Sequence, residues 1–421
     1  MFFQPHTGRL RLRTLVCLLA CSVCLQASAQ ISSTITALPA SSANTPGQHL
    51  TLAQAWQLAQ QQALSRAAQA EHAAALAAAR ASALPAPAEL SWQIEDWRSG
   101  RGTRSLQLSQ QLRTPAQSRA QAALAQSGIA LADAELAQQQ ASLRADLMQA
   151  FGDAVLAQVR AQLAQEGAAL AQRMAASAAR RVQAGKIAAA EGQRAALAHT
   201  QAALEAEQAQ TAQQNALQTL AALLGLADGS GLMLPPDLPP APAPDSAPQA
   251  TMPALQQAHS VAAQAQAAYA LARAQAVPTP SLSLGIKRDL ESGRQQVLLG
   301  LSLPLPFGAQ HSALQQQAWQ RQQAAQARLE AEQQRLHSET QQLHRAWQAQ
   351  RAEVEALRSQ LLPAARHSWE QAERAFAAGK FSLLDVLEAQ RNWLQMRSQY
   401  LHANSQLWRS ASALERLYPT F

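Results

Sequence analysis

The sequence predicts a mainly α-helical fold with a small β part, built from two structural repeats. Three observations predict it. Long stretches rich in Ala and Gln contain no proline, which is typical of long helices rather than of a thick globular core. Two pairs of alternating apolar and polar segments interrupt them, and each pair has the pattern of a β-hairpin. The same order of elements then occurs twice.

The first 29 residues have the features of a cleaved signal peptide. Three arginines precede an apolar run that ends in Ala27-Ser28-Ala29. Cys17, Cys21 and Cys24 all fall in this leader, so we expect no disulfide and no thiolate metal site in the exported chain. A second interpretation keeps Cys21 as a lipidated N-terminus.

The rest of the chain divides at a proline-rich stretch. Residues 229–253 hold most of the prolines of the middle of the chain and are predicted to be an extended linker. We assign residues 50–228 to a first repeat and residues 254–421 to a second. Residues 30–49, rich in Ser, Thr and Ala, are predicted to be a flexible N-terminal segment.

Two landmarks recur in both halves at nearly the same spacing. Pro85-Ala86-Pro87 and Pro278-Thr279-Pro280 precede the two hairpins at an offset of about 193 residues. Ala184-Gly185-Lys186 is echoed by Ala378-Gly379-Lys380 at an offset of about 194 residues. Each half is therefore predicted to run helix, strand, loop, strand, long helix, glycine turn, helix.

The long helix of the first half runs from about residue 116 to residue 184, on the order of 100 Å at 1.5 Å per residue. Apolar or small residues recur along it every seven residues, the period of a coiled coil. Shorter helices are expected at 52–83, 188–224, 254–276 and 382–417. Their lengths suggest end-to-end stacking of 188–224 with 254–276, and of 382–417 with 52–83, to match the long helices.

The four predicted strands have the alternation of a barrel wall between lipid and water. Four strands cannot close a barrel, and open edges in a bilayer leave backbone groups unsatisfied, so three copies would complete a twelve-stranded barrel. Trp92 and Trp97 are candidate membrane-interface residues. Arg98, Arg101 and Arg104 would meet anionic lipid headgroups or form a solvated turn. Hairpins packed on helices of a soluble protein would show the same alternation.

Charge and motifs exclude several classes of function. The formal charge is +7, but three of the 34 Lys and Arg residues lie in the leader, which leaves 31 against 27 acidic residues. This balance gives no nucleic-acid signature. Phosphate loops, nucleophile elbows and metalloprotease helices are missing, and the histidines lack the spacing of metal ligands. We expect no enzyme, no cofactor and no bound metal.

Together the landmarks resemble the TolC family of outer-membrane efflux and secretion ducts, over essentially the whole mature chain. The matching segments are Leu50-Thr51-Leu52, the two Pro-x-Pro hairpin entries, and the stretch Gly379-Lys380-Phe381-Ser382-Leu383-Leu384-Asp385-Val386-Leu387-Glu388-Ala389-Gln390-Arg391. The resemblance implies a homotrimer whose barrel in the outer membrane continues as a helical barrel through the periplasm. It also implies two protein partners, a periplasmic membrane-fusion adaptor and an inner-membrane resistance-nodulation-division pump.

The resemblance also implies site residues at the periplasmic end. The glycine turns of the family form the tip that meets the adaptor, and the matching residues here are Gly185, Lys186, Ile187, Gly379, Lys380, Phe381 and Ser382. Both glycines would also serve as plain helix caps. The aperture of the family is constricted by acidic side chains, matched here by Asp385 and Glu388. In a trimer they would form two negative rings that favour cations, and otherwise they lie on a solvated helix face.

The first strand, Glu89–Glu95, and the segment 301–307 resemble the CzcC-like branch, which exports divalent heavy-metal cations. The sequence thus predicts a passive outer-membrane duct for these cations in a tripartite efflux system, driven by the pump. A duct for drugs or secreted polypeptides and a periplasmic coiled-coil scaffold are the alternatives, and the sequence does not select the cargo.

Overall fold

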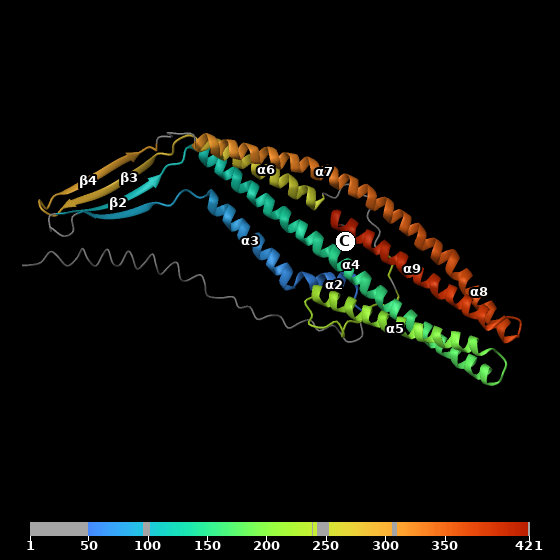
Figure 1. The fold of residues 1–421 in the computed structure, drawn as a ribbon. Helices are drawn as coiled ribbons and strands as arrows, with labels where there is room; N and C mark the ends of the chain where they lie inside the picture. The colour runs from blue at the N-terminus through green and yellow to red at the C-terminus, as the bar shows by residue number, and fades with distance from the viewer. Residues whose placement is uncertain (1–48, 96–101, 238, 242–251, 305–309, 420–421) are drawn as a thin grey trace, which may run out of the picture. The chain divides into compact units, whose positions relative to one another are not determined.

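The computed structural model describes residues 49–95, 102–237, 239–241, 252–304 and 310–419 (Figure 1). The predicted leader, residues 30–48, Trp97 and parts of the predicted linker lie outside the described residues. The described part is mainly helical with one small antiparallel sheet, which confirms the predicted class at that level. Within it, no helix combines the length and the apolarity that a membrane span requires.

The elements follow the predicted order closely. They are α2 (Leu52–Gln60), α3 (Ala63–Ala83), β1 (Glu89–Glu95), β2 (Thr103–Gln111), α4 (Pro115–Gln183), α5 (Ala189–Leu223), α6 (Pro253–Ala274), β3 (Ser281–Asp289), β4 (Gln295–Ser302), α7 (Gln310–Ala356), a π-helical turn (Leu357–Leu361), α8 (Leu362–Ala377) and α9 (Leu383–Leu417). The first predicted helix is divided in two at Gln61 and Gln62.

The four strands form one sheet in the order β1-β2-β3-β4, and all neighbours are antiparallel. The central pair joins the two repeats, because β2 belongs to the first half and β3 to the second. Leu106 lies opposite Ile286 and Leu108 opposite Leu284 across this pair. β1 and β4 form the two edges of the sheet.

Helix α4, with 69 residues, is the central rod of the described chain. Helices α3, α5, α6 and α9 pack against it, and α6 and α9 also pack against α7 (Figure 1). The helices that share the space between α4 and α7 are therefore α6 and α9. The predicted stacking of α5 with α6, and of α9 with the first helix, is wrong (Figure 1). Helix lengths misled the prediction: α3 and α6 have 21 and 22 residues, while α5 and α9 have 35 each. Stacking α5 with α3 and α9 with α6 therefore gives rods of about the same length as stacking α5 with α6 and α9 with α3.

The main core surrounds the middle of α4. Fully buried side chains there include Leu147, Phe151 and Val155, which pack with Trp408 of α9 and with α5. Gly152 brings α9 close, because a Cβ at this position would lie 2.6 Å from Cε3 of Trp408. A small residue is therefore required where α4 and α9 meet.

Leucines spaced by seven residues, or by a multiple of seven, also form a stripe in the second half, at Leu329, Leu336, Leu343 and Leu357. Leu329, Leu336 and Leu357 of this stripe are buried. Gln350, which interrupts it, accepts a hydrogen bond from the Ser410 hydroxyl of α9, so the interruption is a polar contact between helices. The π-helical turn ends two residues before Pro363, whose missing N–H prevents regular α-helical bonding there.

Candidate functional site

The two glycine turns have the same backbone geometry. After α4, the Gly185 N–H donates to the Val182 carbonyl (2.9 Å) and the Lys186 N–H to the Arg181 carbonyl (2.9 Å). After α8, Gly379 donates to Phe376 (3.0 Å) and Lys380 to Ala375 (2.9 Å) in the same way. Both are Schellman motifs, which cap the last carbonyls of a helix.

Glycine is needed in these turns for its backbone conformation. Gly185 has a φ of 69° and Gly379 a φ of 74°, in the left-handed region that side chains disfavour. A Cβ at either position would meet no atom within 4 Å, so packing does not require glycine there. Both glycines are thus exposed, with open space around them.

A small apolar cluster joins the two turns of the chain. Ile187, from the first turn, packs with Phe376 and Leu387, which flank the second turn, over buried Ala178 and Ala195. The structure therefore brings the two sets of predicted tip residues together. Lys186, Lys380 and Ser382 are exposed, and the Phe381 side chain is 49% exposed.

Asp385 lies in the first turn of α9 and closes a capping box with Ser382. Its carboxylate accepts hydrogen bonds from the Ser382 N–H (2.8 Å) and hydroxyl (2.7 Å), while the Asp385 N–H donates to the Ser382 hydroxyl oxygen (3.3 Å). These bonds, the hydroxyl first, hold the pKa of Asp385 below its usual value. The carboxylate is thus held ionised and oriented at the helix start.

Glu388 lies three residues further along the same helix, so that it shares a face with Asp385. Both side chains are exposed. Among the described residues, no ion pair joins either carboxylate to a basic side chain. The pair therefore presents two uncompensated negative charges at the start of α9.

The sheet has one apolar and one polar face. Directly opposed residues share a face, and the register aligns Leu90, Leu108, Leu284 and Leu299 in one row and Trp92, Leu106, Ile286 and Val297 in the next. The other face carries mainly Ser, Gln and charged residues, among them Ser91, Gln107 and Lys287. The predicted alternation is confirmed.

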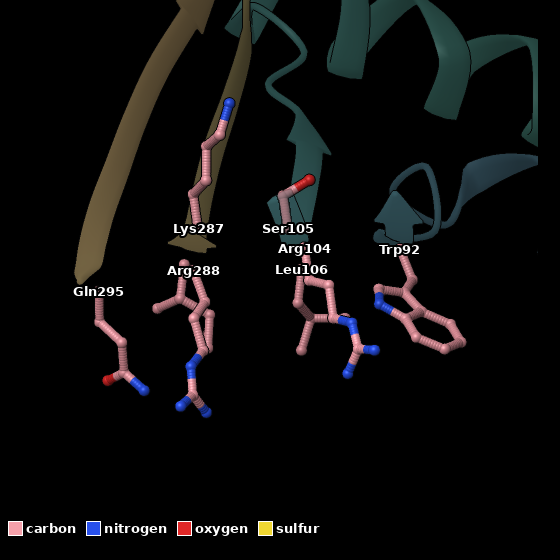
Figure 2. A pocket seen from close by; sticks show the side chains of 8 residues that line it. Trp92, Arg104, Ser105, Leu106, Lys287, Arg288 and Gln295 are labelled. Atoms are coloured by element: carbon pink, nitrogen blue, oxygen red, sulfur yellow. The ribbon is translucent and has the colours of Figure 1, made fainter. Parts of the chain in front are cut away.

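The apolar face is not covered by helices of the same chain. Trp92 is 69% exposed, Leu299 75% and Val297 74%. A contiguous apolar surface of this kind marks a contact with a partner or with lipid. Trp92, a predicted interface residue, does lie on this face, and Figure 2 shows its side chain on the same side as those of Arg104 and Arg288.

The described residues contain no group of three or more His, Asp or Glu side chains placed to hold a metal ion. His72 contacts Asp133 (2.7 Å) as an isolated pair.

Comparison with known proteins finds a family-level similarity in the second repeat. Residues 247–418 match the family model described as outer membrane efflux protein. A curated relative is the cobalt-zinc-cadmium resistance protein CzcC of Cupriavidus metallidurans, 29% identical over 140 residues. The match covers 33% of this chain and 34% of the length of that protein.

Solved structures share the fold over most of the chain. A membrane protein from Pseudomonas aeruginosa has a TM-score of 0.73 at 22% identity, covering 87% of this chain and 93% of its own. CusC, described by its conformational changes on folding and transmembrane channel formation, has a TM-score of 0.72 at 18% identity, with coverage of 87% and 92%. The CmeC outer membrane channel of Campylobacter jejuni has a TM-score of 0.72 at 16% identity, with coverage of 87% and 85%. The resemblance to the TolC family is confirmed.

Two features of the site were not predicted from the sequence. The capping role of Asp385 was missed, although Ser382 precedes it at the spacing of a capping box. The pairing of Arg104 with Arg288 across β2 and β3 was also missed, because it depends on the strand register between the two repeats.

Proposed function

We propose that this chain is one protomer of a homotrimeric outer-membrane efflux duct. Three four-stranded sheets close a twelve-stranded barrel in the membrane, and the helices continue it through the periplasm. The duct is passive, and an inner-membrane resistance-nodulation-division pump drives export through a periplasmic adaptor. The predicted leader exports the chain.

The observation that carries this proposal is the two-faced sheet with open edges. β1 is exposed along its whole length, and β4 nearly so. In a bilayer each unpaired backbone group at these edges costs several kcal/mol, so pairing of β1 with β4 of a neighbouring protomer removes the cost. Closure then places the apolar face against lipid and the polar face around water.

The glycine turns support the proposed adaptor contact. Gly185, Lys186 and Ile187 lie beside Gly379, Lys380, Phe381 and Ser382 at the ends of the paired helices. Half-exposed Phe381 and Leu384, 57% exposed, offer an apolar surface that follows the exposed Lys380 in the sequence. A partner helix hairpin of complementary shape would bury this surface.

Divalent heavy-metal cations are the proposed cargo. The match to CzcC, whose name refers to cobalt, zinc and cadmium resistance, supports this choice. Asp385 and Glu388 support it too, since three copies of each would form negative rings at the aperture that raise the local concentration of cations.

Fractionation and growth test the proposal in two steps. The protein should be recovered with outer-membrane material as a trimer that dissociates on heating, and recovery as a soluble periplasmic monomer would contradict the duct. A deletion strain should lose growth on Zn²⁺, Co²⁺ or Cd²⁺ and recover it with the gene supplied on a plasmid. Sensitivity to dyes and detergents with unchanged metal tolerance would instead favour a duct for drugs.

A further inference from the structure

We propose that Arg104 and Arg288 together bind the phosphate group of a lipid in the outer leaflet. The inference rests on the proposed function, since it needs the apolar face of the sheet to lie in the membrane with the hairpin turns outward. It adds a specific lipid site to that function.

The two arginines form a directly opposed pair. Arg104 of β2 lies across from Arg288 of β3, and the same row continues with Ile94 on β1 and Gln295 on β4. Side chains opposed in this way have Cβ atoms about 5 Å apart. Figure 2 shows Arg104, Arg288 and Gln295 pointing to the side of the sheet that carries Trp92, while Lys287 points the opposite way.

Two like charges opposed on neighbouring strands repel each other unless an anion lies between them. Both arginines are exposed, and among the described residues no carboxylate pairs with either one. The nearby carboxylate of Glu95 is engaged on the other face, where it accepts hydrogen bonds from Thr103 (2.7 Å) and Lys287 (3.4 Å). The row is therefore positive and lacks its own counter-charge.

Phosphate fits this row in chemistry and in shape. Each guanidinium can donate two parallel hydrogen bonds to phosphate oxygens, and the Gln295 amide can donate another. Arg104, Arg288 and Gln295 line a shallow depression of about 160 Å³, with Trp92, Leu106 and Ile286 on its apolar side. Ser105 and Lys287 also border it, but their side chains point to the opposite face of the sheet (Figure 2).

The apolar side indicates a lipid rather than a free anion. Trp92 is 69% exposed and Ile286 57%, and both lie in the row of the same face next to the arginine row. Acyl chains would cover these side chains while the headgroup phosphate reaches the guanidinium groups. Long basic side chains at a membrane interface, with aromatic residues beside them, are suited to this arrangement.

Native mass spectrometry of the purified full-length channel in detergent tests the inference. The probe is bisphosphorylated lipid A, and the variants are Arg104→Gln, Arg288→Gln and the double substitution. We expect the apparent Kd for lipid A to rise at least about tenfold in the double variant and less in each single one. Lys287→Gln, one residue away on the opposite face, is the matched control and should stay within about twofold.

An unchanged Kd in the double variant, or an equal loss in Lys287→Gln, would overturn the inference. If the double variant does not assemble, the two single variants decide it in the same way. Displacement of lipid A by excess inorganic phosphate would show a free-phosphate site and overturn the lipid assignment. Trimer formation and conductance of the wild-type channel are measured in parallel, so that failure of the duct itself is distinguished from failure of the lipid site.

Discussion

At the scale of single residues, Asp385 has two roles. It caps α9 through Ser382, and it is also one of the acidic residues proposed for the aperture. The equivalent turn of the first repeat lacks the cap, because Ala188 stands at the N-cap and makes no side-chain hydrogen bond. The start of α9 is therefore better defined than the start of α5, and its carboxylate is held in a fixed direction.

The cap makes the start of α9 sensitive to acid. The pKa of Asp385 is lowered in the folded chain by the Ser382 hydrogen bonds, so its contribution is complete above the ordinary aspartate pKa of about 3.9 and is lost as pH falls through the lower folded value. We predict that hydrogen exchange at the first turn of α9, corrected for intrinsic rates, accelerates below about pH 4.

Ser382→Ala is the control for this prediction. It removes the hydroxyl that is the largest cause of the lowered pKa of Asp385, so exchange should already be faster at neutral pH and change less with acid. Equal pH dependence in the variant and the wild type would contradict a role for the cap.

At the scale of helices, the contact of α4 with α9 depends on one glycine. The Cβ of Gly152→Ala would lie 2.6 Å from Cε3 and 2.8 Å from Cδ2 of Trp408, a fully buried ring that cannot move aside without a shift of α9. We predict a net loss of about 1–2 kcal/mol, the overpacking cost less the gain in helix propensity. The thermal midpoint of the purified channel should fall accordingly.

Gly128→Ala is the matched control in the same helix. Its Cβ would meet Ala79 and Gln264 at 3.8 Å, an ordinary contact, so stability should stay the same or rise by about 0.5–1 kcal/mol. If Gly128→Ala lost as much stability as Gly152→Ala, the loss would be a general effect of replacing glycine in α4.

The helices and strands were largely predictable from the sequence, but their packing was not. Proline at residues 115 and 253, the glycine turns and the period-two alternation define element ends locally, so most bounds agree with the structure. The partners of α6 and α9 are set by tertiary contacts. Helix length was the one clue in the sequence, and it could not decide between partners because α3 is nearly as long as α6, and α5 is as long as α9. The break after α2 was also missed. There Gln62 lies against Gly225, where a Cβ would be 2.0 Å from its Oε1.

At the scale of the assembled molecule, the proposed trimer would bring three Asp385 and three Glu388 side chains to one aperture. Replacing both with Ala removes six negative charges from the trimer. We predict higher single-channel conductance in planar bilayers and weaker block by multivalent cations, because repulsion and cation binding at the constriction both disappear.

Glu191→Ala is a suitable control, since it removes an exposed acid from the equivalent helix start of the first repeat without touching the proposed rings. Unchanged conductance in the double variant would remove Asp385 and Glu388 from the aperture.

The central claim, that the two faces of one sheet meet lipid and water, is tested most directly by cysteine labelling. Gln107 and Leu108 are neighbours in the middle of β2 on opposite faces, and the three cysteines of the chain lie in the predicted leader. In the reconstituted channel, a hydrophilic maleimide should label Gln107→Cys and leave Leu108→Cys unmodified. Equal labelling of both positions would contradict the account, because it would mean that both faces of the sheet are in water.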